Sequence, residues 1–191
     1  MKFTVLSLRK YIEELASDTP IPGGGGTSAL VAALGAALAS MVGSIVLRKK
    51  KKASERRALE KVLAELSAIR RFFEHAVDTD PKVYQKVMGT YRKARKLKDR
   101  VAAERIVDHA LQSSFAFQQN LASKIAETQK LIGKLHVYSK GSIANDLLVA
   151  SALLGGAWKG AYYTAKINAD YVHDTRRKKS LLNDLHRTPR I

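Results

Sequence analysis

The sequence predicts an all-α protein, a single-domain helical bundle, from three observations. Apolar residues recur with a helical period over most of the chain, no segment alternates apolar and polar residues as a strand does, and two long segments consist mainly of small uncharged residues. A chain of 191 residues with 46% hydrophobic content can bury one core, and no Pro- or Ser-rich linker divides it. We therefore expect one domain over residues 1–175 and a frayed basic tail over residues 176–191.

The first helix is expected to follow Ser7, a residue type that caps helix N-termini. Its apolar side consists of Leu8, Tyr11, Ile12 and Leu15. The turn-forming residues Asp18-Thr19-Pro20 are expected to end it.

A rigid Pro20-Ile21-Pro22 segment then leads into four glycines, Gly23, Gly24, Gly25 and Gly26, ahead of a helix expected to begin near Thr27. Glycines leave backbone N–H groups uncovered and permit φ > 0, so a planar or anionic ligand can approach the main chain at a helix N-terminus. A flexible hinge between two helices gives the same pattern. A binding site and a hinge therefore stay open as alternatives at this point.

Small residues recur every four positions on the helix that follows, so another helix backbone can approach it closely. One row is Ser28, Ala32, Ala36, Ser40 and Ser44, and a second is Gly35, Ala39 and Gly43. A similar row near the C-terminus is Ala152, Gly156, Gly160 and Thr164. We expect these two helices to pack on each other, or each on its copy in a second subunit.

A membrane span is an alternative for the uncharged run 27–47, because Arg48-Lys49-Lys50-Lys51-Lys52 follows it as a positive flank. Six alanines, three serines and two glycines dilute the run, which favours a buried helix of a bundle. We expect no membrane association. Residues 1–17 carry charges throughout and do not form a signal peptide.

The remaining periodic segments predict further helices. Residues 59–76 keep an apolar face, Asp80-Pro81 suits the N-cap and first position of a separate helix, and residues 101–135 form a long helical stretch with Gly133 as a candidate break. Residues 143–168 form the last long helix.

The amino-acid composition excludes several kinds of functional site. The chain has no cysteine, which excludes disulfides, thiolate nucleophiles and cysteine metal sites, and a cytoplasmic protein is the simplest expectation. The five histidines lack metal-ligand spacing, so we expect no metal.

The charge balance is strongly basic, with 34 Lys and Arg against 17 Asp and Glu and a net charge of +17. Such a field attracts polyanions or small anionic substrates. The basic runs lie at residues 48–52, 92–98 and 176–179. No aromatic residues interleave them as stacking platforms, so nucleic acid is a possible partner that the pattern does not favour.

Four blocks of sequence carry a family resemblance. They are Pro20-Ile21-Pro22-Gly23-Gly24-Gly25 with the Ala/Gly helix after it, Asp78-Thr79-Asp80 with Tyr84 and Val87-Met88, Asn145-Asp146-Leu147-Leu148-Val149-Ala150, and Gly160 to Asn168. In this order the chain resembles the formiminotransferase-cyclodeaminase C-terminal family over nearly its whole length. It departs from that pattern at Gly26, where a serine is usual, and at Ser142, where the usual pair is Gly-Asn.

The resemblance implies an α-helical homodimer or larger homo-oligomer with a folate site in a cleft. It implies an enzyme, a formiminotetrahydrofolate cyclodeaminase (a lyase) or a methenyltetrahydrofolate cyclohydrolase (a hydrolase). A tetrahydrofolate derivative would be the substrate, with no separate cofactor.

The resemblance also implies site residues. Asp80 and Asp146 would transfer protons at a carbon flanked by two nitrogens, and their alternative role is a carboxylate at a helix start. Gly23, Gly24, Gly25 and Gly26 would contact the folate, and Lys49 and Lys50 its glutamate tail, with a solvated helix end as the alternative for the lysines.

A second function remains open, a non-catalytic scaffold of the same fold that binds a polyanion such as nucleic acid. Gly26, Ser142 and the basic runs favour it, whereas Asp80, Asp146 and the glycine segment favour the enzyme.

Overall fold

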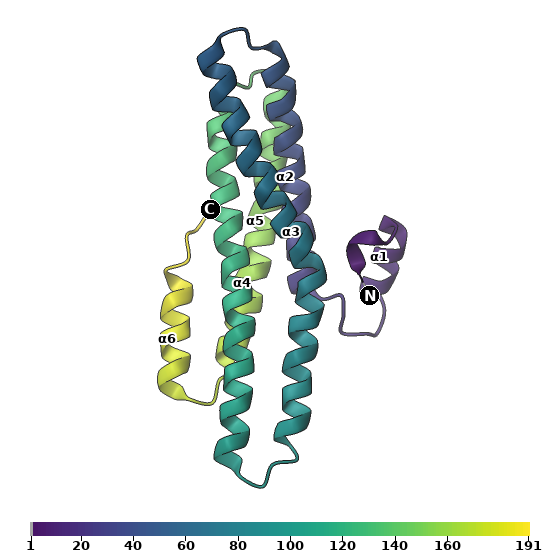
Figure 1. Ribbon diagram of the computed structural model, residues 1–191, viewed down its shortest axis with the longest axis vertical. Helices are drawn as coiled ribbons and strands as arrows, with labels where there is room; N and C mark the ends of the chain where they lie inside the picture. The colour runs from purple at the N-terminus through teal and green to yellow at the C-terminus, as the bar shows by residue number, and fades with distance from the viewer. Residues whose placement is uncertain (1) are drawn as a thin grey trace.

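Four long helices lie side by side along one axis in the computed structural model, which describes residues 2–191 (Figure 1). Short connections at residues 50–52, 95–99 and 137–141 make consecutive helices antiparallel, as in an up-and-down bundle. The long helices are α2 (Gly24–Lys49), α3 (Ala53–Ala94), α4 (Arg100–His136) and α5 (Ser142–Asp170). The flanking elements are η1 (Phe3–Val5), α1 (Leu8–Leu15) and α6 (Thr175–His186). No strand occurs within residues 2–191, and the all-α prediction is confirmed.

The helix α2 packs on α3, α4 and α5. It begins at Gly24, three residues before the predicted start at Thr27. Within the described part of the chain it is the one helix long and apolar enough to span a membrane, and 44% of its most apolar window is buried in the bundle. Leu34 and Met41 lie exposed on its outer side.

The two small-residue helices pack on each other, as predicted, because glycines bring their backbones together. A Cβ on Gly35 of α2 would lie 3.2 Å from the Ala150 carbonyl oxygen of α5, and a Cβ on Gly160 of α5 would overlap the Ser28 hydroxyl of α2. The predicted row on α5 is only partly at this contact, since Ala152 and Gly156 are exposed. The buried side of α5 consists of Leu147, Ala150, Leu154, Ala157, Ala161, Ala165 and Ala169.

The prediction of a separate helix beginning at Asp80-Pro81 is wrong, because α3 continues through both residues. A proline inside a helix removes one N–H donor and costs about 3 kcal/mol. The bundle buries Pro81, and burial of its apolar ring opposes this cost. Asp80 is therefore held in the middle of a long helix and does not cap one.

Two further boundaries differ from the prediction. The helix α4 runs through Gly133 without a break, since an isolated exposed glycine is tolerated in a helix. The prediction of a frayed tail over residues 176–191 is also wrong up to His186, because α6 (Thr175–His186) forms there. Asp174 caps α6, and Leu181 and Leu185 bury it against the bundle.

At the N-terminal end of the chain, Ser7 caps α1 as predicted by accepting a hydrogen bond from the Lys10 N–H at 3.2 Å.

Candidate functional site

A cavity of about 510 Å³ lies at the N-terminal end of α2, where α3, α4 and α5 contribute side chains and α2 contributes the backbone of its glycines. The linker before α2 closes one side of it. Its lining residues are Pro20, Ile21, Gly23, Gly24, Gly25, Asp80, Tyr84, Val87, Met88, Tyr91, Leu111, Ser114, Thr164, Ile167, Asn168 and Tyr171. Three of the four sequence blocks noted above therefore meet in one place: the glycine segment, the Asp80 block and the block ending at Asn168.

The glycines serve this site through close packing and not through left-handed backbone. None of Gly23–Gly26 has a positive φ, which within residues 2–191 occurs only at Gly141. A Cβ on Gly25 would overlap both the Asp80 carboxylate and the Gln118 amide, whereas a Cβ on Gly24 would meet only the Thr164 hydroxyl at 3.8 Å. Gly25 is thus the position where a side chain cannot fit.

Asp80 is the one carboxylate that lines the cavity, and it is 9% exposed. Its Oδ1 atom accepts a hydrogen bond of 2.6 Å from the Nε2 atom of Gln118, a residue of α4 that is 1% exposed. Within the described residues no Lys, Arg or His lies within ion-pair distance of it. Burial raises the pKa of Asp80 above its ordinary value, and the Gly26 N–H and Gln118 oppose that shift.

Tyr11 of α1 is near enough to the Asp80 carboxylate to be affected by its charge. Tyr11 is 5% exposed, and burial raises its pKa, with the negative charge of Asp80 adding to the shift and Thr27 opposing it. Asp78 fixes this N-terminal segment to α3, because its carboxylate accepts hydrogen bonds from the Phe3 and Thr4 N–H groups and the Thr4 hydroxyl.

The cavity walls are mainly aromatic and apolar, and no Lys or Arg lines them. The aromatic contributors are Tyr84, Tyr91 and Tyr171. Asn168 and Thr164 donate their side-chain hydrogen bonds to backbone carbonyls of their own helix, which leaves the Asn168 amide oxygen to accept. Aromatic walls, a few polar groups and one buried carboxylate suit a planar heterocycle that is neutral or positively charged.

Lys49 and Lys50 lie at the opposite end of α2, 25 residues from Gly24, which is roughly 37 Å along a helix. With Lys140 they line a separate hollow of about 500 Å³. The Lys50 ammonium lies 3.4 Å from a Glu55 carboxylate oxygen and 5.3 Å from the centre of the Tyr138 ring. The structure does not bring either lysine to the cavity.

Asp146 is also outside the cavity. It is the fifth residue of α5, and the first turn of that helix contains no acidic residue, so the alternative role as a cap is wrong for Asp146. Thr164 of the same helix lines the cavity, and the 18 residues between them correspond to roughly 27 Å.

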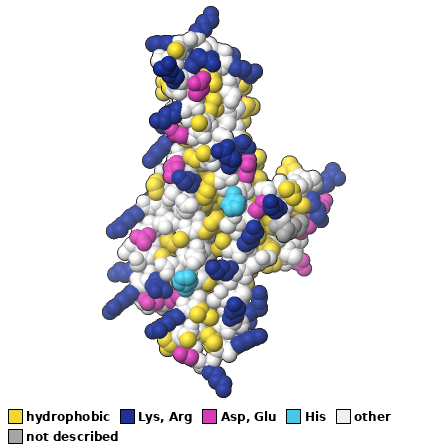
Figure 2. Space-filling view, in the orientation of Figure 1, with side chains coloured by type: hydrophobic (Ala, Val, Ile, Leu, Met, Phe, Trp, Pro, Cys, Tyr) yellow, Lys and Arg dark blue, Asp and Glu magenta, His cyan; other side chains and the backbone are white. Residues whose placement is uncertain are grey.

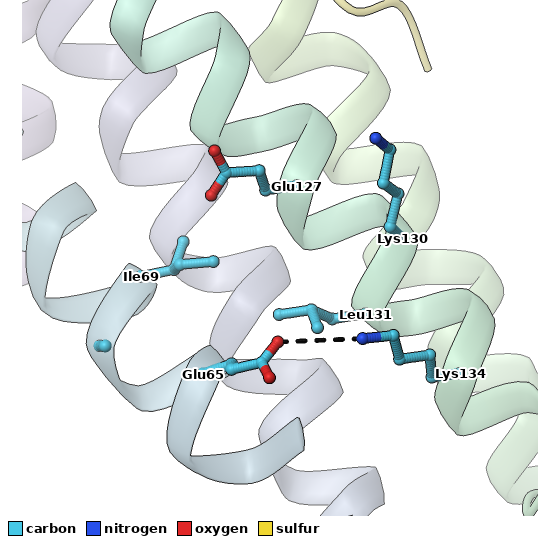
Figure 3. A pocket seen from close by; sticks show the side chains of 7 residues that line it. Glu65, Ile69, Glu127, Lys130, Leu131 and Lys134 are labelled. Carbon is cyan, nitrogen blue, oxygen red and sulfur yellow. Dashed lines mark ion pairs between the residues drawn. The ribbon is translucent and has the colours of Figure 1, made fainter. Parts of the chain in front are cut away.

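Another hollow, the α3–α4 groove, lies between α3 and α4 and has only exposed charged side chains on its rim (Figure 3). It measures about 350 Å³, and its rim carries Glu65 and Lys134, whose charged atoms lie 3.9 Å apart. Both side chains are well exposed, and a surface pair of this kind contributes little free energy.

The sequence did not single out Gln118, Ser114 or Leu111, the α4 residues at or behind the site. One signal existed: Gln118 lies on the same side of α4 as the apolar residues Leu111, Leu121 and Ile125. A polar residue in such a row needs a buried partner, and here that partner is Asp80.

The chain is similar in sequence and in fold to known proteins. The family model described as Formiminotransferase-cyclodeaminase matches residues 7–187. A methenyltetrahydrofolate cyclohydrolase of Methylorubrum extorquens is 31% identical over 186 residues, covering 92% of this chain and 86% of that protein. A formimidoyltransferase-cyclodeaminase of Rattus norvegicus is 28% identical, and the chain spans 32% of its length. The crystal structure of a formiminotetrahydrofolate cyclodeaminase from Thermotoga maritima superposes with a TM-score of 0.82 over 96% of this chain and 88% of that one, at 24% identity.

Proposed function

The chain belongs to the formiminotransferase-cyclodeaminase family, and from that premise we propose that it is an enzyme of folate one-carbon metabolism acting on a tetrahydrofolate derivative. Two reactions fit: closure of a formimino group with loss of ammonia, and hydrolysis of a methenyl bridge. The observation that supports this best is the buried carboxylate of Asp80, which has no cationic partner among the described residues and lies in an aromatic cavity that no Lys or Arg lines.

Both reactions pass through a carbon flanked by two nitrogens, which carries positive charge. A carboxylate held in a water-poor cavity stabilises such a charge far better than one in bulk solvent. In the hydrolysis, water adds to the cationic bridge carbon and loses one proton to solvent. The second proton leaves the oxygen as the carbonyl forms and one carbon–nitrogen bond breaks, and the released nitrogen takes up a proton. We propose that Asp80 accepts and returns this proton.

In the deaminating closure, the second folate nitrogen attacks the formimino carbon, and the amino group must be protonated before it leaves as ammonia. The same carboxylate can carry the proton from the attacking to the leaving nitrogen. The pterin ring would lie between the tyrosine walls and the Gly24–Gly25 backbone. The roles predicted for Asp146, Lys49 and Lys50 stay predictions, and within one chain the length of α2 and α5 keeps them from a ligand in this cavity.

A direct assay tests this function. Purified protein mixed with methenyltetrahydrofolate, and separately with formiminotetrahydrofolate, should change the absorbance of the methenyl chromophore faster than buffer alone does. Asp80→Asn protein should remove that difference. Equal rates with and without wild-type protein for both folates would contradict the proposal.

We also propose that the enzyme acts as a homodimer or larger oligomer in the cytoplasm. Leu34 and Met41 of α2 and Leu8 and Ile12 of α1 are exposed apolar residues on a protein of charge +17, and uncharged surface is where two such chains can approach without repulsion. Ala32 and Ala36, in contrast, are fully buried in the bundle, so this part of their row serves the internal core. Light scattering should show an oligomer that Leu34→Glu weakens, and a wild-type monomer at micromolar concentration would contradict this.

A further inference from the structure

Gln118 touches Asp80 without lining the cavity. It comes from α4, is 1% exposed, and donates from Nε2 to the Asp80 Oδ1 atom at 2.6 Å. Gly25 of α2 makes room for this contact, because a Cβ there would overlap both side chains. Three helices therefore meet around one buried hydrogen bond directly behind the only carboxylate of the cavity.

The donor is uncharged, which matters in this protein. The chain has 34 Lys and Arg residues, yet the partner of Asp80 is an amide. A lysine or arginine at this place would also fix the carboxylate, but it would cancel the charge that a cationic ligand needs. An amide fixes the position of the carboxylate and leaves its charge available.

The other end of the Gln118 amide has no partner. Its Oε1 atom is buried and accepts no hydrogen bond from the described residues, which is costly for a carbonyl oxygen. The two ends of a carboxamide have nearly the same shape, so a half-turn about its last torsion would present Oε1 to a protonated Asp80. The side chain can thus donate to a carboxylate and accept from a carboxylic acid, and the bond to the carboxylate is the stronger of the two because its acceptor is charged.

We propose that Gln118 is a positioning residue of this site, which holds Asp80 from behind with an uncharged hydrogen bond in both protonation states. The carboxylate then keeps its charge for a cationic ligand and its place when it takes up a proton. The role of Gln118 in a reaction rests on the proposed function, whereas the effect of Gln118 on the pKa of Asp80 does not.

The titratable groups near Asp80 are few. Tyr11 of α1 is near enough to be affected by its charge, and Tyr84, Tyr91 and Tyr171 lie in the cavity walls. The elements α2, α4 and α5 add only uncharged groups there, such as Gly26, Ser114 and Asn168. Because phenols ordinarily ionise near pH 10, about six pH units above a carboxyl group, the acidic limb of a pH profile should report Asp80.

Gln118→Met tests the inference, since methionine fills similar volume and cannot donate. Gln129→Met is the matched control, because Gln129 lies on the same helix, donates from Nε2 to the Ser151 hydroxyl at 2.9 Å and also has an unpartnered Oε1 atom. The ¹³C NMR titration of the Asp80 carboxyl, assigned with Asp80→Asn, should move to higher pH by about one unit or more in Gln118→Met. It should not move in Gln129→Met.

Activity gives a second readout. The acidic limb of kcat/KM should shift upward by the same amount as the NMR midpoint, and kcat/KM near neutral pH should fall about 10-fold or more. A merely structural role would lower the melting temperature without moving either midpoint. If Gln118→Met does not fold, Gln118→Asn, whose amide is one methylene too short to reach, should show the same upward shift.

An unchanged Asp80 midpoint in either folded variant would overturn the inference. If wild-type protein neither binds nor converts folates, the proposed function fails, and the NMR titration still decides whether Gln118 controls Asp80. If wild-type protein is active and the variants keep its pH profile, the inference alone fails.

Discussion

The two ends of α2 differ in how their charged groups are buried and paired. At the Gly24 end, Asp80 is buried, lacks a cationic partner and lies in an aromatic cavity. At the Lys49 end the lysines are near solvent, and Lys50 pairs with Glu55. One end buries a single charge, whereas the other leaves its charges near solvent. A buried charge without a cationic partner, and not a large number of charges, therefore marks the group proposed to react.

The strongest test of this contrast compares two aspartates. Asp80→Asn keeps the shape of the side chain and removes its proton-accepting charge, so kcat/KM should fall by about 10² to 10⁴. Asp146→Asn should leave kcat/KM close to that of the wild type, since Asp146 lies roughly 27 Å along α5 from the cavity. Steady-state rates with both folates give the answer. A large loss in Asp146→Asn beside a small one in Asp80→Asn would reverse the assignment.

A pair of glycine variants sharpens the contrast inside the cavity. Gly25→Ala should push Asp80 and Gln118 apart, with a loss of about 1–3 kcal/mol in the free energy of unfolding and of most activity. Gly24→Ala should change both far less, because its methyl group would meet only Thr164 at an ordinary contact distance. Denaturant melts and rates measure the two effects. Equal damage from both variants would indicate that the segment acts as a hinge.

The pH dependence of stability tests the burial of Asp80. Because the pKa of Asp80 is raised in the folded protein, its protonated form is favoured by folding, and this favourable contribution is lost as the pH rises through the folded pKa. Asp80→Asn should therefore melt at a higher temperature than the wild type at neutral pH. The difference should vanish below the ordinary carboxyl pKa. A lower melting temperature for the variant at neutral pH would show that the carboxylate stabilises the fold.

The smallest effect is expected from the basic surface. Figure 2 shows Lys and Arg distributed over the whole length of the visible face, without a single concentrated patch. Lys49→Gln and Lys50→Gln should leave kcat unchanged and alter binding of anionic ligands only at low salt. Binding to DNA or RNA should be weak at physiological salt. Submicromolar affinity there, with a steep salt dependence, would instead favour the polyanion-binding scaffold.

The sequence predicted the parts of the molecule that follow from local pattern. The helical periods, the Ser7 cap and the small-residue contact between α2 and α5 agree with the structure. Pro81 was misread because local propensity favours a helix start there, while α3 is continuous and Pro81 is buried within the fold. The C-terminal segment was misread because two buried leucines, Leu181 and Leu185, suffice to dock a basic helix.

The site was only partly predictable for a related reason. Asp80 and the glycine segment were named from their sequence blocks, although the reason given for the glycines was backbone freedom and the structure shows close packing at Gly25. Gln118 stands 38 positions from Asp80, and no local pattern reports a contact across that separation. Lys49, Lys50 and Asp146 satisfied chemical expectations, but the length of straight helices carries them away from the cavity.

The most direct test of the central claim is a crystal structure of the protein with a stable tetrahydrofolate derivative. The pterin ring should occupy the cavity between Tyr84, Tyr171 and the Gly24–Gly25 backbone, with an Asp80 carboxylate oxygen within hydrogen-bond distance of a one-carbon nitrogen. Folate bound instead in the Lys49–Lys50 hollow, with this cavity empty at saturating ligand, would contradict the account.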